Sequence, residues 1–416
     1  MIYNVHDKPP FGKLILFSIQ MVLSVFVATV LIANICGTSV SGALVGAGLS
    51  TLIYVAITKG CSPMFLSSSG AFVAAIIFAL SMGGYTGVLI GGVTACVVYC
   101  ILGLIFTRIP YQSIYKIFPR SLIGAVTCVI GINLMPFCLS YVQINGETNM
   151  WGVGIALVTM LVIALVSHYA KGIFKILPFL VGIIAGYAIA VVLTLCGVYK
   201  IIDFSVFNNL TFFSMPDFAF NHWGSIDVAA VVPIVIMFVA YTVSACMEAL
   251  SDHAALGGII GVDLYQNPGL SRIFIGEGVA NLLGTAVGGL NICSYGESVA
   301  DTGFSRVSSI YVIITAAIML GLLGFIMPVQ VFIASIPSCV FCGAAFILYG
   351  FIACSGIKML QKVNLDEQKH LVIVSAVLSL GISGVVAGGE VINFSATALA
   401  LIAGVVLNII LKEKAE

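Results

Sequence analysis

The sequence predicts an all-α polytopic membrane protein with fourteen transmembrane spans. They are expected to form a seven-plus-seven inverted repeat in which spans 3 and 10 are interrupted. Three observations support this fold class: the composition, the distribution of basic residues and a short internal repeat. Of the 416 residues, 61% are hydrophobic and 8% are charged, and the mean hydropathy is +1.20. Because soluble proteins carry roughly 25% charged residues, this composition excludes a soluble enzyme, a nucleic-acid-binding protein and a disordered chain.

A membrane helix needs about 20 predominantly apolar residues, and fourteen segments of the chain meet or nearly meet this requirement. They are residues 14–36, 41–58, 64–80, 84–106, 116–139, 151–168, 175–197, 228–250, 272–289, 293–305, 308–327, 332–354, 369–387 and 393–411. The third and the tenth segments are short, rich in Ser and Gly, and interrupted. The 44 glycines fit a helical membrane protein, since small residues let membrane helices approach closely.

The basic residues test this span count independently. If the N-terminus is cytoplasmic, the count places fifteen of the sixteen Lys and Arg residues on the cytoplasmic side and only Lys200 outside. Cytoplasmic loops of membrane proteins collect Lys and Arg. If either weak segment were not a span, the basic residues after it would be assigned to the opposite side of the membrane. Both segments are therefore expected to cross or re-enter the membrane. The pattern predicts that both termini are cytoplasmic, and the absence of long loops fits a bacterial inner membrane.

A short internal repeat pairs the two weak segments with each other. Residues 68–74, SSGAFVA, align with residues 294–300, SYGESVA, and four of the seven positions match at an offset of 226. Seven spans per repeat is an odd number, so the second copy enters the membrane from the opposite face. Interrupted spans at corresponding positions of inverted repeats point to the binding site of a transporter. The alternative is a chance match between two poorly packed helices.

Two acidic residues lie within predicted spans, Glu248 in span 8 and Glu297 in the interrupted span 10. A charge at membrane depth costs roughly 2.5–3.5 kcal/mol on insertion scales, which makes each a candidate functional residue. Asp252 follows Glu248 by four residues and therefore shares its helix face. Like charges oppose double ionisation, so this pair can bind and release protons, as a proton-coupled carrier requires.

Other interpretations of the polar residues remain open at this point. Glu248 is alternatively a structural hydrogen-bond partner, and Asp252 with His253 alternatively marks the cytoplasmic end of span 8 in water. Glu277 and Asp301 are expected to be boundary residues of spans 9 and 10. Gln20, in the otherwise apolar span 1, either binds substrate or bridges two helices.

The interrupted spans predict a polar cradle. A helix that begins inside the membrane offers free N–H groups and a partial positive charge, and two such ends are expected near Ser68–Gly70 and Tyr295–Gly296. N–H donors beside carboxylates suit a ligand that carries both acceptors and N–H groups, such as a nucleobase. An inorganic anion would be repelled by an ionised Glu297.

The sequence predicts no metal site, no cofactor and no enzymatic activity. Cys339 and Cys342 form a CxxC, but it lies within a span, where small buried residues explain it better than a zinc or redox site. The chain has no GxxxxGK[ST], HExxH or GxSxG motif.

The chain resembles the nucleobase–cation symporters of the nucleobase–ascorbate transporter family, in particular the bacterial uracil permeases. The resemblance covers essentially the whole chain and is densest in MEALSDHAALGGIIGVDLYQNPGLSRIFIGEGVANLLGTAVGGLNICSYGESVADTGFSRV. NPGLSR at 267–272 and LYGFIACSGIKML at 348–360 match further family segments. The resemblance places Glu248 and Glu297 on the two substrate glutamates and Asp252 on a position linked to proton coupling.

The resemblance implies a core domain and a gate domain with substrate bound between them, beside short strands in spans 3 and 10. The core would comprise residues 1–107 and 226–327, and the gate residues 108–200 and 328–416. It also implies a homodimer formed through the gate domain.

Two positions depart from the family pattern. The span-1 motif usually reads Gln-His but here is Gln20-Met21, and an aromatic position of span 3 falls on Gly70, with Phe72 two residues later. Losing a ring weakens stacking on a base or enlarges the pocket. Xanthine and urate members usually carry Gln where this chain has Glu297, which favours uracil.

The expected function is import of uracil, or a close nucleobase, together with protons by alternating access. Glu248 and Glu297 would accept the N–H groups of the base, and the backbone N–H groups of Gly70, Tyr295 and Gly296 would bind its carbonyls. Phe72 and Gln20 complete the expected substrate site, and Asp252 with Glu248 would couple protons. The alternatives are a purine carrier of the same family and an anion transporter of the sulfate-permease type.

Overall fold

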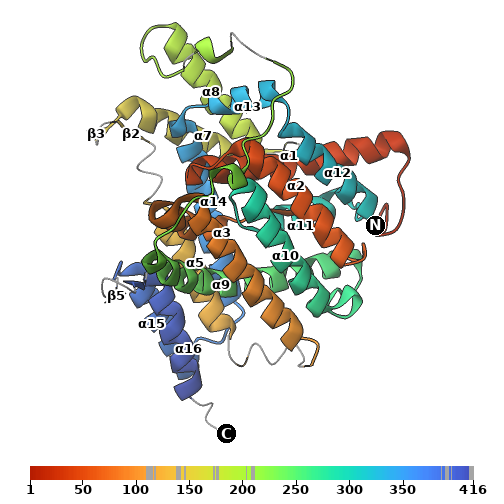
Figure 1. The fold of residues 1–416 in the computed structure, drawn as a ribbon, viewed down its shortest axis with the longest axis vertical. Helices are drawn as coiled ribbons and strands as arrows, with labels where there is room; N and C mark the ends of the chain where they lie inside the picture. The colour runs from red at the N-terminus through yellow and green to blue at the C-terminus, as the bar shows by residue number, and fades with distance from the viewer. Residues whose placement is uncertain are drawn as a thin grey trace.

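The protein is described here by a computed structural model (Figure 1). The structure describes residues 1–108, 116, 119–136, 142–144, 147–171, 174, 178–202, 204–207, 211–385, 387–388, 393–394 and 396–411. Within these residues, seven helices are long and apolar enough to cross a membrane, and four further apolar helices are shorter. The chain is therefore a polytopic helical membrane protein, as the composition predicts.

The helices follow the predicted spans in order. They are α1 (Phe11–Cys36), α2 (Val40–Ile57), α3 (Val73–Ile105), α5 (Arg120–Leu134), α7 (Met150–Tyr169), α8 (Pro178–Leu195), α9 (Val228–Ile260), α10 (Leu270–Gly288), α11 (Gly296–Ser305), α12 (Ile310–Leu323), α13 (Met327–Ala334), α14 (Ser338–Leu360), α15 (Gln368–Ile382) and α16 (Ala396–Ile410). The strands are β1 (Leu66–Ser68), β2 (Gln143–Ile144), β3 (Glu147–Thr148), β4 (Ile292–Ser294), β5 (Ala387–Gly388) and β6 (Asn393–Phe394).

Three boundaries differ from the prediction for identifiable reasons. Predicted spans 3 and 4 meet within α3, which is broken at Gly83 and Gly84, and Gly84 has a positive φ of 56° that glycine tolerates. Predicted span 8 ends at residue 250, but α9 continues to a left-handed cap at Gly261. Predicted span 12 is two helices, because Pro337 precedes α14 and separates it from α13.

Small residues allow the helices to approach closely, as the glycine content predicts. A side chain at Gly46 of α2 would meet backbone atoms of Gly284 and Gly288 in α10 at 3.2 Å. A side chain at Gly131 of α5 would lie 2.4 Å from the backbone nitrogen of Ala353 in α14. The α5–α14 crossing therefore brings backbones together at a distance that only glycine permits, and the α2–α10 crossing leaves little room for a side chain.

A short antiparallel pair, β1 with β4, joins two segments that are far apart in the chain. Leu66 lies opposite Ser294, Ser67 opposite Cys293, and Ser68 opposite Ile292, and all six residues are buried. The backbone N–H of Ser69 donates to the Asn291 carbonyl at 2.9 Å and extends the ladder. Each strand leads directly into a helical segment, the 3-10 turn Gly70–Phe72 before α3 and the helix α11.

Side chains of two neighbouring helices hold the strand pair in place. Thr51 Oγ1 of α2 donates to the Leu66 carbonyl at 2.9 Å and accepts the Leu66 N–H at 3.1 Å. The Asn281 amide of α10 donates to the Ile292 carbonyl at 2.7 Å. Leu66 and Ile292 are the first residues of two antiparallel strands, so the pair is anchored at both of its ends.

We expect Thr51→Val to lower the stability of the purified protein. Valine keeps the shape of threonine but leaves the buried N–H and carbonyl of Leu66 without this partner, which costs about 1–3 kcal/mol. The melting temperature in detergent measures this loss. Thr94→Val is the matched control, because among the described residues the Thr94 hydroxyl donates to the Ile90 carbonyl within its own helix. Equal melting temperatures for the two variants would contradict this anchoring role.

Candidate functional site

The N-terminus of α11 and one face of α9 form the centre of the candidate site. Asp252 lies against this N-terminus, since a Cβ added to Gly296 would be 3.6 Å from its Oδ1. Glu248 is one turn earlier on α9, and both acidic side chains interact electrostatically with Cys293 of β4. A helix N-terminus favours a nearby carboxylate. The structure thus brings Glu248, Asp252 and Gly296 together, whereas the side chain of Glu297 lies outside what it describes.

Serine hydroxyls beside the strand pair add hydrogen-bonding capacity. Those of Ser68, Ser69 and Ser294 are buried and have no hydrogen bond of ordinary geometry among the described residues. Ser69 lies beside Cys293 and Ser294 beside Glu277. Buried polar groups are normally paired, so these hydroxyls at the ends of β1 and β4 are suited to a polar ligand.

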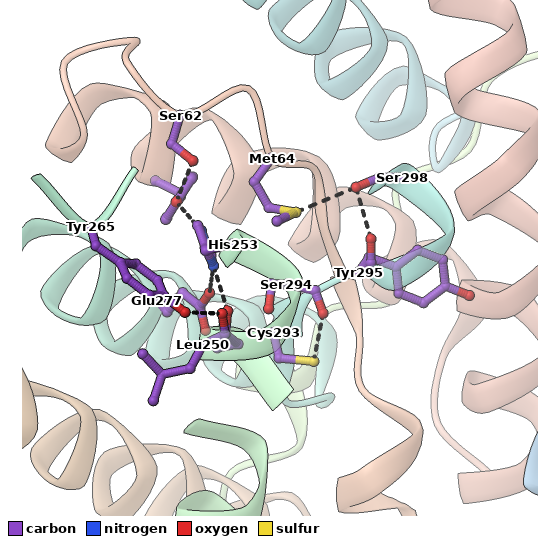
Figure 2. Close-up of polar contacts among 12 residues, drawn as sticks. Ser62, Met64, Leu250, His253, Tyr265, Glu277, Cys293, Ser294, Tyr295 and Ser298 are labelled. Carbon is purple, nitrogen blue, oxygen red and sulfur yellow. Dashed lines mark hydrogen bonds and ion pairs between the residues drawn. The ribbon is translucent and has the colours of Figure 1, made fainter. Parts of the chain in front are cut away.

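Tyr295 and the segment Gly70–Phe72 border the same region. Tyr295 precedes α11. The Tyr295 carbonyl accepts hydrogen bonds from the backbone N–H of Ser298 at 2.9 Å and from the Ser298 hydroxyl at 2.8 Å (Figure 2). A Cβ at Gly70 would lie 3.0 Å from Cδ1 of Ile352 in α14, so Ile352 borders the space that an aromatic ring would need. The Phe72 ring is buried and stacks on Phe238 of α9 at a centroid distance of 6.0 Å. A substrate contact of Phe72 stays a prediction.

Gln20 bridges two helices. Its amide Nε2 donates to Asp301 Oδ1 at 2.5 Å and so joins α1 to α11. The expectation that Asp301 is a boundary residue is wrong, because this side chain is only 2% exposed. The half-helix α11 packs against α1 and α9, and its middle residues Ser298, Val299, Asp301 and Thr302 are buried.

Two further site residues were misjudged from the sequence. Glu277 was expected at a span boundary, but it lies two turns into α10 and is 0% exposed. His253 is also 0% exposed, which contradicts the alternative that it sits in water at the end of span 8. The local sequence does indicate that Glu277 is buried, since Glu277 stands between two glycines and Asn281 follows it by one helical turn on the same face.

The two CxxC residues lie within a membrane helix. Cys339 and Cys342 are both buried in α14. Their position agrees with the interpretation of small buried helix residues.

A comparison with known protein families decides the family. The xanthine–uracil permease model, described as "Permease family", matches residues 12–388. The chain belongs to this permease family. The resemblance seen in the residues of spans 8 to 12 is thereby confirmed, and the chain is a multi-pass membrane transporter.

Curated relatives of this permease are named uracil permeases. The protein of Bacillus caldolyticus is 33% identical over 416 residues, which cover 99% of this chain and 94% of the relative. The protein of Bacillus subtilis is 31% identical, with coverage of 99% and 96%. The protein of Escherichia coli K12 is 28% identical, with coverage of 98% and 94%.

Solved structures with the same fold are anion transporters. The transmembrane domain of the cyanobacterial bicarbonate transporter BicA has a TM-score of 0.62 at 14% identity, covering 98% of this permease and 100% of that chain. Murine solute carrier 26 family member A9 has a TM-score of 0.73 at 12% identity, covering 97% of this permease and 68% of that chain. At such identities the likeness concerns the fold alone.

Proposed function

We propose that this permease is a secondary transporter that imports uracil, or a close nucleobase, together with protons by alternating access. The observation that carries the proposal is the strand pair β1–β4, with its buried serine hydroxyls, beside Glu248, Asp252 and the N-terminus of α11. Uracil carries both N–H donors and carbonyl acceptors, which match carboxylates and N–H or O–H donors. The names of the relatives support the same substrate.

The roles of the residues follow from this match. Glu248 and Glu297 accept the N–H groups of the base, and the backbone N–H groups of Gly70, Tyr295 and Gly296 serve its carbonyls. Asp252 and Glu248 bind the coupling proton. A proton that enters with a neutral base moves one charge, worth about 2.3 kcal/mol per 100 mV of membrane potential.

The proposal includes fourteen spans in two inverted repeats. Strands β1 and β4 are 226 residues apart, the offset of the sequence repeat, and at this offset Ser67 lies opposite its own counterpart Cys293. Such a register is what a two-fold axis through the strand pair produces. Helix packing has the same symmetry, since α2 packs on α10 and on α12 while α10 packs on α3 (Figure 1).

We also propose the division into a core and a gate. Helices α1, α2, α3, α9, α10 and α12 pack mainly among themselves, whereas α5 packs on α14 and α15, α7 on α8 and α14, and α15 on α16. This grouping supports a core of residues 1–107 and 226–327 and a gate of residues 108–200 and 328–416. Dimerisation through the gate, a bacterial inner membrane and cytoplasmic termini belong to the same proposal.

Thermal stabilisation of the purified protein tests the substrate. A ligand that binds only the folded state raises the melting temperature, so uracil, thymine, xanthine, hypoxanthine, urate and sulfate are compared at equal concentration. We expect a shift with uracil. A shift with purines alone would support a purine carrier and make Gly70 the determinant of specificity. A shift with sulfate alone would overturn the nucleobase assignment.

A further inference from the structure

A second group of protonatable side chains lies beside the candidate substrate site. His253 of α9 and Glu277 of α10 are both 0% exposed, and His253 Nδ1 is 3.7 Å from Glu277 Oε1. Figure 2 shows the two side chains pointing toward each other. Neither residue has a role in the substrate site proposed above.

Hydrogen bonds define the state of the imidazole. Nδ1 lies 2.7 Å from the Ala249 carbonyl, which can only accept, so Nδ1 carries a hydrogen. Nε2 lies 2.7 Å from the Tyr54 hydroxyl, and the Tyr54 hydroxyl lies 2.9 Å from that of Ser62. Ser62, Tyr54 and His253 therefore form a continuous chain of hydrogen bonds that ends at the pair.

This chain accommodates two protonation states of His253. In the charged state, Nε2 carries a hydrogen and donates to the Tyr54 hydroxyl, which itself donates to Ser62 Oγ. In the neutral state, the Tyr54 hydroxyl turns its hydrogen from Ser62 to Nε2. Rotation of one hydroxyl thus accommodates one added proton.

The surroundings of Glu277 favour a bound proton. Both of its carboxyl oxygens lack a hydrogen bond of ordinary geometry among the described residues, although Tyr99 and Ser294 lie beside them. The titratable groups that face the pair are Tyr54 of α2, Tyr99 of α3, Cys246 and Glu248 of α9, and Cys293 of β4. None of these groups is basic. A buried carboxylate without a partner is costly, so a proton on His253 or on Glu277 itself stabilises the pair.

An open cavity lies beside His253. It has a volume of about 360 Å³, and its lining includes His253, Gly257, Gly261, Asp263 and Tyr265 but not Glu277. These residues lie at or just beyond the C-terminal end of α9, which the distribution of basic residues predicts to be cytoplasmic. Because His253 is 0% exposed, the cavity brings water close to it without direct contact.

We propose that His253 and Glu277 form a proton-binding site of their own, separate from Glu248, Asp252 and Glu297, which exchanges one proton with the cytoplasm in each transport cycle. The inference rests on the proposed proton-coupled transport. In the loading step a proton from cavity water forms the Nε2–H bond, and the positive imidazolium offsets the Glu277 carboxylate. In the release step the same bond breaks and the proton returns to water. No other bond changes.

Transport by the full-length protein in liposomes tests this site. Two quantities are measured: protons taken up per uracil, with a pH-sensitive dye, and uracil counterflow, which needs no net proton movement. We expect Glu277→Gln and His253→Gln to retain counterflow but to take up one proton fewer per uracil than the wild type, and to accumulate less uracil at the same pH gradient. We also expect the pH dependence of uptake to flatten in both variants.

A His–Glu contact nearer the surface provides the matched control. His370 Nε2 lies 3.6 Å from Glu367 Oε2, and the Glu367 side chain is 53% exposed, so Glu367→Gln changes a contact of similar length without a buried carboxylate. We expect this variant to behave like the wild type.

The possible failures have different meanings. Wild-type protein that moves uracil without protons, or does not move uracil, would overturn the proposed function. Wild-type coupling that persists in both variants would overturn only the proton site. Loss of the folded protein in both variants would identify a structural pair and overturn the site as well.

Discussion

Glu248→Gln is expected to abolish uracil uptake and to remove the thermal stabilisation by uracil, while the protein without ligand stays folded. The amide keeps the size of the side chain but loses the charge that strengthens a hydrogen bond to an N–H group of the base. A hydrogen bond to a charged group contributes about 1.5–3 kcal/mol. Losing this hydrogen bond lowers the affinity for uracil on the order of 10- to 100-fold.

Glu248 is well placed for this role. It is half-buried on α9, one turn before Asp252, on the face that meets β4 and the N-terminus of α11. The amide also takes up no proton, so coupling through the pair with Asp252 is lost together with binding.

Uptake by liposomes and the uracil-induced shift in melting temperature measure the two effects. Glu367→Gln is the control, since Glu367 is exposed before α15. Wild-type binding in Glu248→Gln would remove this residue from the substrate site. Loss of uracil uptake with normal uracil binding in this variant would restrict the role of Glu248 to proton coupling.

Gly131→Val is expected to prevent stable packing of α5 on α14. An added Cβ would lie 2.4 Å from the Ala353 nitrogen and 2.7 Å from the Tyr349 carbonyl oxygen. Because both contacts are backbone atoms, one helix has to move, and such overpacking costs about 1–3 kcal/mol or more. Transmembrane helices associate through close packing of this kind. A helix displaced at Gly131 therefore loses packing contacts along the whole α5–α14 crossing.

The yield of monodisperse protein and its melting temperature report the effect. Gly154→Val in α7 is the matched control, because nothing lies within 4 Å of a Cβ at this position. It introduces the same β-branched residue into a helix. A melting temperature for Gly131→Val equal to that of the control would show that the two helices separate readily.

Burial explains which candidate residues the sequence could identify. Glu248 and Glu297 stood out because each is an acid within an apolar stretch, where insertion is costly. Glu277 is also such an acid, but its place near the edge of a predicted span made it a boundary residue. The start of α10 at Leu270 and its packing against α2 and α3 put it in the interior. A shift of two residues in a helix start was enough to change the interpretation.

No pattern along the chain predicts which distant residues form hydrogen bonds with each other. Gln20 and Asp301 are 281 residues apart, and Tyr54 and His253 are 199 apart. Both contacts depend on helix packing that no local spacing predicts. For Gln20 the sequence left two interpretations equally open, and the contact with Asp301 supports the bridge between helices.

Composition, charge and motifs along the chain are enough to identify the membrane class, the family and the order of the helices. Each membrane segment must be apolar and nearly free of charge to enter lipid, so this signal is present in every segment separately. The packing of the helices, in contrast, makes Thr51 and Asn281 the anchors of the strand pair and brings His253 to Glu277. In an apolar membrane, hydropathy favours no particular helix neighbour. The partner of each polar side chain is therefore set by backbone packing at glycines and by hydrogen bonds made across helices.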